Sequence, residues 1–145
     1  MATITVPDVP AAIRAHLLAD AGVAAQVGTR VYSQELPRDM ADDMPVKAVV
    51  ARSSSGGFGP GRLSLPVQSL RIDTTCYGAS TVDAYAVHAA VHKALKYLSR
   101  RTIGAVLLHW ATVDIAALHG RDPDVPEWAF VFASWNVLAA EVAVT

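Results

Sequence analysis

The stretch "VQSLRIDTTCYGASTVDAYAVHAAVHKALKYLS", residues 67–99, contains the two periodicities that decide the fold. Its first part alternates two sets of side chains, Leu70, Ile72, Thr74 and Cys76 against Arg71, Asp73, Thr75 and Tyr77, which predicts a β-strand. Ser80 and Asp83 then form a pattern similar to a capping box, with Asp in place of the preferred Glu. Apolar residues at helical spacing follow to about residue 99, so an amphipathic helix is expected to pack across a sheet.

Two hairpins are predicted around this strand and helix. The β-rich segment 44–53 should pair with the strand "LPVQSLRIDTTCYG", residues 65–78, through the glycine-rich loop "SSSGGFGPGRLSLP", residues 53–66. A connection of about 12 residues is longer than a hairpin requires. Residues 102–118 and 126–144 should form the second hairpin, because Gly120, Pro123 and Pro126 mark a turn between them.

A short helix is expected near the start of the chain. Asp8 can cap it, Pro10 lies in its first turn, and Gly22 is expected to end it. Both strands of the second hairpin are apolar at alternate and intervening positions, which indicates that both faces of the sheet need cover. We therefore predict one α+β domain over residues 1–145, with an antiparallel four- to five-stranded sheet, two main helices on one face and a long β-hairpin loop. The second face is left for another copy or a partner.

Composition excludes several classes of protein. The 145 residues are 52% apolar, but no apolar run approaches the roughly 18 residues of a membrane span, so no membrane partner is expected. The N-terminal residues lack the pattern of a secretory signal. The one cysteine, Cys76, is read as a small buried hydrophobe in a protein of the reducing cytosol. A net charge of −1 gives no bulk attraction to polyanions.

No catalytic, cofactor or metal site is predicted. The glycine-rich loop lacks the Lys-Ser/Thr ending of a nucleotide-binding loop and lies between two strands, whereas phosphate loops precede a helix. His88 and His92 are one helical turn apart and could chelate a metal, but Ala89 replaces the Glu of the zincin pattern and no third ligand is evident. A small enzyme or ligand-binding domain with a site around Tyr85, His88 and His92 stays open as an alternative.

Charges are unevenly distributed along the chain. Four acids and one base occupy residues 35–43, whereas residues 44–72 contain four bases and no acid. This pattern fits either a solvated surface or a charge-complementary contact between neighbouring chains. The glycine-rich loop is expected to become ordered on assembly, with Phe58 in an apolar recess and Arg62 near the acids of an adjacent chain; an idle loop is the alternative. The predicted partner-contact residues are Phe58, Arg62, Arg52, Glu35, Asp39, Asp42 and Asp43.

The order of these elements is similar to one known family. The phrase "LLADAGVAAQVGTRVYSQELP", residues 17–37, the strand "RIDTTCYG", residues 71–78, with its helix, and the C-terminal strand pair resemble the tail-terminator or tail-completion proteins of long-tailed phages and gene transfer particles. The resemblance covers nearly the whole chain, and none of its segments is a catalytic signature.

This resemblance implies a structural virion protein rather than an enzyme. It implies a homo-oligomeric ring, commonly a hexamer, at the head-proximal end of the tail tube, where it terminates tail elongation and joins tail to head. The implied partners are further copies of the chain, the tail tube protein and a head-side connector or stopper, with DNA passing through the lumen without specific binding. The implied location is the tail or neck of a virion assembled in the host cytoplasm. Another neck component, such as a head-completion or connector protein, stays open.

Overall fold

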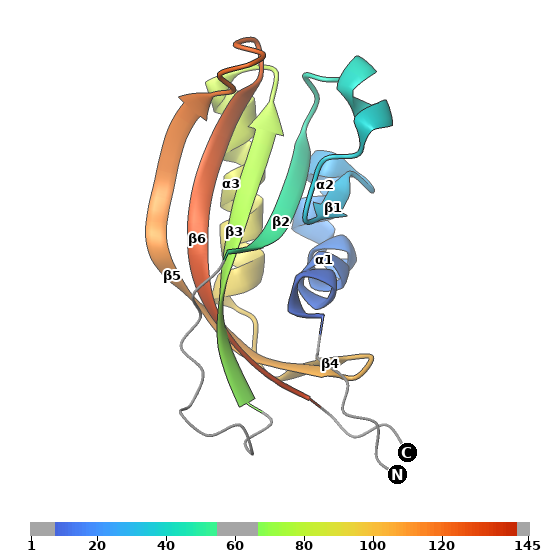
Figure 1. Cartoon of the computed structure of the whole chain (residues 1–145), viewed down its shortest axis with the longest axis vertical. Coiled ribbons are helices and arrows are strands. Elements are labelled where there is room, and N and C mark those ends of the chain that lie inside the picture. Colours follow the sequence, from blue (N-terminus) through green and yellow to red (C-terminus); the bar gives the residue numbers. More distant parts are fainter. Residues whose placement is uncertain (1–7, 55–66, 142–145) are drawn as a thin grey trace.

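The computed structural model describes residues 8–54 and 67–141 of the chain. This described part contains three α-helices, one 3-10 helix and six strands, and Figure 1 shows how they are arranged. In chain order they are α1 (Val9–Ala19), α2 (Ala21–Val27), β1 (Val31–Ser33), η1 (Arg38–Asp42), β2 (Ala48–Ser54), β3 (Val67–Gly78), α3 (Thr81–Lys96), β4 (Arg101–Ile103), β5 (Val106–Arg121) and β6 (Ala129–Glu141).

The strands form one mixed sheet in the order β1-β2-β3-β6-β5-β4. The two predicted hairpins are present, because β2 pairs antiparallel with β3 and β5 pairs antiparallel with β6. The prediction of an antiparallel sheet of four to five strands is wrong, because the sheet has six strands and β1 runs parallel to β2. Residues 34–47, which include η1, supply the crossover connection that a parallel pair requires.

The helices begin at side-chain caps that the sequence contains. The Asp8 carboxylate accepts a hydrogen bond from the Ala11 backbone N–H at 3.1 Å, and the Ser80 hydroxyl accepts one from the Asp83 N–H at 3.2 Å. Asp20 caps a second helix at the Val23 N–H, so α1 ends before Gly22, which lies inside α2. No helix in the described residues is long and apolar enough to cross a membrane.

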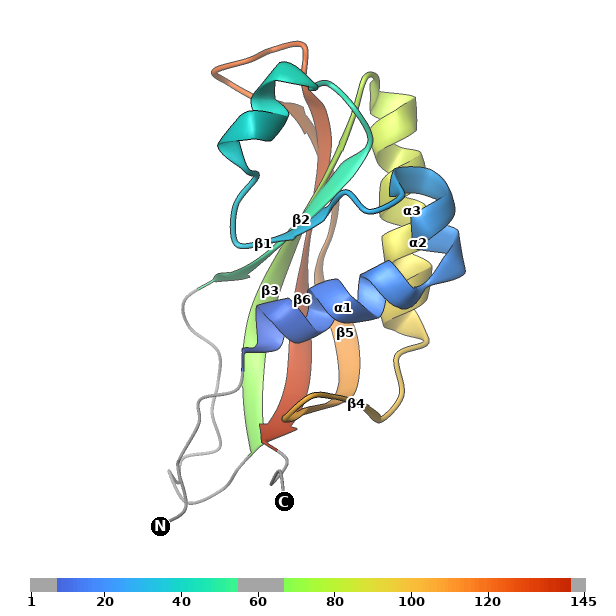
Figure 2. The ribbon, with the colours of Figure 1, turned by 90° about the vertical axis from the view of Figure 1, so that its right-hand side faces the viewer.

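All three α-helices lie on one side of the sheet, as Figure 2 shows. The core fills the space between them and the sheet. Trp135 of β6 is its largest fully buried side chain, and the indole Nε1 donates a hydrogen bond to Thr74 Oγ1 of β3 at 3.1 Å. The helices contribute further fully buried side chains to this core: Ile13, Leu17, Val87, Val91 and Leu95. The prediction of helices on one face is therefore correct, with a third helix added.

The strand β3 ends directly against the first turn of α3. A Cβ atom added at Gly78 would lie 2.5 Å from the backbone nitrogen of Ala84 and 2.8 Å from Cβ of Asp83. Only glycine leaves room for this approach, because real Cβ contacts are essentially never below 3.0 Å. The strand and the helix that decide the fold are thus joined by only two residues, Ala79 and Ser80.

The two edges of the sheet differ. At the β1 edge, the Val31 carbonyl accepts a hydrogen bond from Arg14 Nε at 2.7 Å, and the Ser33 carbonyl accepts one from the Glu35 N–H. At the other edge, β4 pairs with residues 106–108 of β5, and no described strand pairs with the outer side of β5 beyond them. The segment predicted as one strand from residue 102 is interrupted by Gly104, whose φ of 58° turns the chain between β4 and β5.

Candidate functional site

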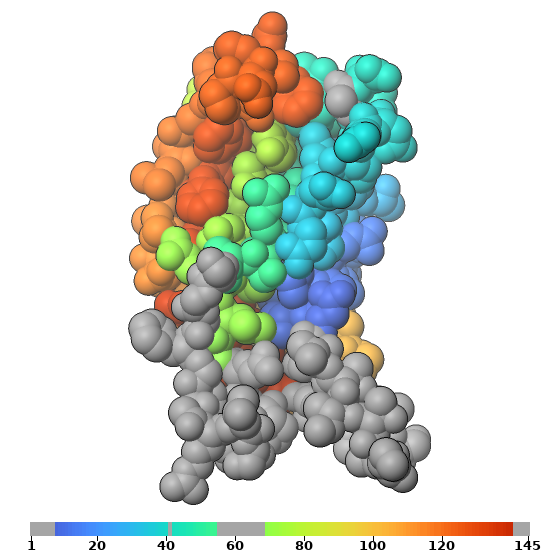
Figure 3. Space-filling view, in the orientation of Figure 1, coloured from blue at the N-terminus to red at the C-terminus, as the bar shows by residue number. Residues whose placement is uncertain are grey.

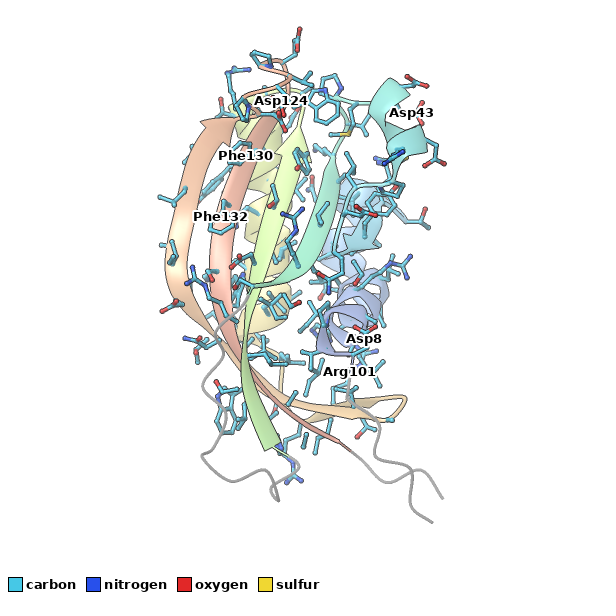
Figure 4. All side chains as sticks on the ribbon, viewed as in Figure 1. Asp8, Asp43, Arg101, Asp124, Phe130 and Phe132 are labelled. Carbon is cyan, nitrogen blue, oxygen red and sulfur yellow. The ribbon has the colours of Figure 1, made fainter. Side chains whose placement is uncertain are left out.

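The acidic segment 35–43 projects from the β1 edge of the sheet. Glu35 follows β1, Asp39 and Asp42 lie in η1, and Asp43 caps its C-terminal end; all four are exposed. Figure 2 places η1 on the side of the sheet away from the helices, and Figure 4 places Asp43 at the same end of the molecule as Asp124. Among the described residues, the one ion pair joins Arg71 to Asp73, so these acids have no ionic partner there.

Arg52 of β2 is an exposed residue beside the start of the acidic segment. Its Nε donates a hydrogen bond to the Gln34 carbonyl at 2.8 Å, which places the guanidinium next to the residue that precedes Glu35. The structure therefore brings Arg52 and the start of the acidic segment together within one chain. Phe58 and Arg62, the other predicted contact residues, lie outside the described residues, as does the predicted ordering of their loop.

A polar cluster lies at the centre of the helix-free face, which Figure 3 shows from the front. Arg71 Nε donates to Ser134 Oγ at 2.6 Å, and Ser134 Oγ donates to Asp73 Oδ1 at 2.7 Å. Sequence analysis missed Ser134, because it lies in an apolar run; the alternation of Arg71 and Asp73 in the neighbouring strand was the available signal. A hollow of about 380 Å³ adjoins the cluster and is lined by Ser69, Arg71, Trp110, Thr112, Asp114, Asn136 and Leu138.

Apolar side chains of β6 flank this cluster. Phe130 and Phe132 are labelled in Figure 4, where both lie on the helix-free face. Each is half-buried. The expectation that this face is apolar is thus correct along part of β6, whereas its centre is polar and internally hydrogen-bonded.

A groove of about 320 Å³ separates α3 from β5 on the helix side of the sheet. Tyr85, His88, Ala89 and His92 line it from α3, and Val113, Ala116 and Ala117 line it from β5. The Tyr85 ring stacks on His119 of β5 with centroids 5.6 Å apart, and lies 5.8 Å from the His88 ring. His88 and His92 are 5.9 Å apart. Helical spacing predicted the approach of Tyr85, His88 and His92, whereas His119 joins them through tertiary packing.

The surroundings of His88 in this groove disfavour the charged form of its imidazole. Its side chain is 6% exposed, and its Nδ1 has no hydrogen-bond partner among the described residues. Burial lowers the pKa of His88 below its ordinary value, and the nearby His92 and His119 lower this pKa further. No three His, Cys, Asp or Glu side chains of the described residues are placed to hold a metal ion.

Cys76 lies in the core on β3. Burial raises the pKa of its thiol well above the usual range, so the reactive thiolate form is suppressed. The prediction of a small buried hydrophobe at this position is confirmed.

Comparison with solved structures identifies the fold. A chain from the "Virion of native gene transfer agent (GTA) particle" superposes with a TM-score of 0.70 at 18% sequence identity, over 91% of this chain and 94% of that one. The bacteriophage SPP1 gp17 protein matches with a TM-score of 0.47 at 17% identity, over 87% of this chain and 86% of that one. No protein-family model matches the chain, and no curated protein matches it in sequence. The first likeness shows a shared fold over nearly the whole of both chains.

Proposed function

We propose that this chain is a structural protein of a phage or gene-transfer virion, which forms a ring at the head-proximal end of the tail tube. There it terminates tail elongation and joins the tail to the head. The observation that carries the proposal is the fold shared with a chain of a gene transfer agent virion. The resemblance of residues 17–37 and 71–78 to tail-terminator proteins supports the same role.

The open edge of β5 supports assembly with other chains. Trp110, Val113 and Leu118 of this strand are between 47% and 54% exposed. A long edge strand with apolar side chains is normally covered, because its free backbone groups are a template for pairing. At the β1 edge, local hydrogen bonds already occupy the carbonyl groups of Val31 and Ser33, so this edge differs from the open β5 edge. The two edges are therefore two different surfaces, rather than one surface that pairs with its own copy. Contacts between two different surfaces close into rings when the rotation permits.

The proposed partners follow from this role. They are further copies of the chain, in a ring of six, the tail tube protein and a head-side connector or stopper. DNA passes through the lumen without specific binding, which agrees with a net charge of −1. The proposed location is the tail or neck of the virion, and assembly takes place in the host cytoplasm. A non-enzymatic role is proposed with it.

The proposed contact residues are those predicted from sequence. Glu35, Asp39, Asp42 and Asp43 are exposed, and Arg52 is exposed beside them, which supports a role of this edge in contacts between chains. Phe58 and Arg62 are proposed as contacts to a neighbour, the tube or the head side.

Electron microscopy of the purified protein, alone and with purified tails, tests the proposal. We expect rings, either free or at one end of the tail, and we expect particles lacking the protein to contain unjoined heads and tails. Light scattering gives the number of copies in a free ring. A protein that remains monomeric and unbound when tails are present contradicts the proposal.

Two other functions are separated by further measurements. A head-completion or connector protein would purify with filled heads rather than with tails. The cluster of Tyr85, His88, His92 and His119 favours a ligand-binding groove as the other candidate. Stoichiometric zinc in the purified protein, lost on changing both His88 and His92 to Ala, would support that candidate.

A further inference from the structure

Two features at opposite corners of the subunit are placed to meet in a ring. The 3-10 helix η1 lies at the β1 edge on the helix-free side, and the groove between α3 and β5 lies at the other edge on the helix side. A head-to-tail contact requires two different surfaces on the same subunit. The positions of η1 and the groove satisfy this requirement.

The groove lacks partners for its polar groups. No side-chain hydrogen bond joins Tyr85, His88 or His92 to another described residue, and the buried Nδ1 of His88 is unpaired. A buried polar group without a partner is unfavourable, because it has lost its hydrogen bonds to water. The volume of about 320 Å³ holds roughly ten waters at about 30 Å³ each, so side chains of another segment can enter. The groove thus offers imidazole and phenol groups beside alanine and valine side chains.

The segment η1 has the complementary chemistry. Asp39 and Asp42 are exposed carboxylates, which accept hydrogen bonds, and Met40 between them supplies an apolar side chain. The groove lining includes no acidic residue, so the two surfaces do not repel each other. The sequence predicts that these acids meet Arg62 of an adjacent chain. The groove offers them a different partner, formed by residues that the structure describes.

We propose that η1 of one copy docks in the α3–β5 groove of the next copy, with its carboxylates accepting hydrogen bonds from the groove's histidines and Tyr85. This inference rests on the proposed ring. The segment that occupies the groove belongs to a second copy of the chain. Every subunit has one η1 and one groove, so in a closed ring each η1 meets a groove and each groove holds an η1. The contact also covers part of the apolar β5 edge, where Val113 is half exposed.

Disulfide trapping between two differently tagged variants tests this contact. One variant contains Asp42→Cys and the other contains Ala89→Cys. A disulfide-linked dimer that contains both tags can therefore only join different copies. Cys76 is kept, because its thiol is buried. The matched control replaces Asp42→Cys by Asp124→Cys, which lies at the same end of the molecule in the β5–β6 turn. Each pair is mixed with purified tails, examined for rings by microscopy, and oxidised mildly.

We expect the Asp42→Cys and Ala89→Cys pair to give at least tenfold more mixed-tag dimer than the control pair. If rings form but both pairs give the same amount of mixed-tag dimer, the docking is wrong and the proposed function still holds. Absence of both rings and tail binding in unmodified protein overturns the proposed function and the docking with it. In a third possible result, tails protect the Ala89→Cys thiol from maleimide, but no mixed-tag dimer forms. This result would mean that a different protein occupies the groove, and it would overturn the docking.

A charge change gives a second readout. Asp42→Lys should raise the protein concentration needed for half-maximal ring formation at least tenfold, because a lysine cannot accept hydrogen bonds from the groove. Asp124→Lys, the same change at the same end, should shift it less than twofold. Equal shifts for both variants contradict the docking.

Discussion

The indole Nε1 of Trp135 donates a hydrogen bond to Thr74 Oγ1 at 3.1 Å between two adjacent strands, and both side chains are fully buried. Thr74→Val keeps the shape of the side chain but removes the acceptor, so we expect the free energy of unfolding to fall by about 1 to 3 kcal/mol. Thr75→Val is the matched control, because Thr75 lies on the opposite face of the same strand. Denaturant unfolding of both variants measures the difference, and equal losses would contradict the assigned hydrogen bond.

Gly78→Ala tests the close approach of β3 to α3. The added methyl group would meet the backbone of Asp83 and Ala84, which cannot move without shifting the helix, so we expect a loss of about 3 kcal/mol. Gly22→Ala in α2 is the control, because its Cβ meets only the Asp20 carboxylate at 3.2 Å. That change should alter stability by less than about 1 kcal/mol. Thermal unfolding of both variants measures these changes in stability. A Gly78→Ala variant that is as stable as the unchanged protein would contradict the close approach of β3 to α3.

Stability should fall on acidification because of His88. The pKa of His88 is lowered in the folded state, so between that pKa and the unfolded value near 6.5 the unfolded chain binds a proton that the native chain does not. Stability therefore decreases as pH falls through about 6.5, by at most about 1.4 kcal/mol per pH unit, and stops decreasing below the native pKa. His88→Gln should make the curve between pH 7 and 5 shallower. If the plots of stability against pH run parallel for the unchanged protein and the His88→Gln variant, His88 is not the cause of the decrease.

Cys76 should report on opening of the core. Its buried thiol, with a raised pKa, should react with a maleimide or a disulfide reagent only when the sheet separates from the helices. We expect labelling in denaturant within minutes and at least a hundredfold slower labelling of the native protein. Fast labelling of native protein, at the rate of a free peptide thiol, would show that the core opens readily.

Local pattern was enough to predict the strand and helix of residues 67–99. The alternation along β3 and the Ser80 cap are both present, although α3 ends at Lys96 rather than near residue 99. The break between β4 and β5 escaped prediction, because a strand of three residues such as β4 shows no usable periodicity. The first helix ends at Asp20 rather than at Gly22, because the Asp20 side chain caps α2 and Gly22 lies inside that second helix.

The candidate surfaces were only partly predictable. The exposed acids near η1 follow directly from composition, because charged side chains rarely occupy a core. The meeting of Tyr85 with His119 depends on how β5 packs against α3, and the hydrogen bonds of Ser134 depend on the register between β3 and β6. Neither contact can be predicted from the spacing of residues along the sequence.

The irregular register of β5 has a consequence for how separate copies of the chain meet in solution. Its pairing with β6 shifts between Leu108 and Trp110, between Val113 and Ile115, and between Ile115 and Leu118. Such irregularities bend a strand and break the even spacing of its outward N–H and C=O groups. Two identical β5 edges therefore make a poor ladder with each other, and uncontrolled stacking of free subunits is disfavoured. Separate copies of the chain are therefore expected to stay apart, even though one edge of the sheet is open.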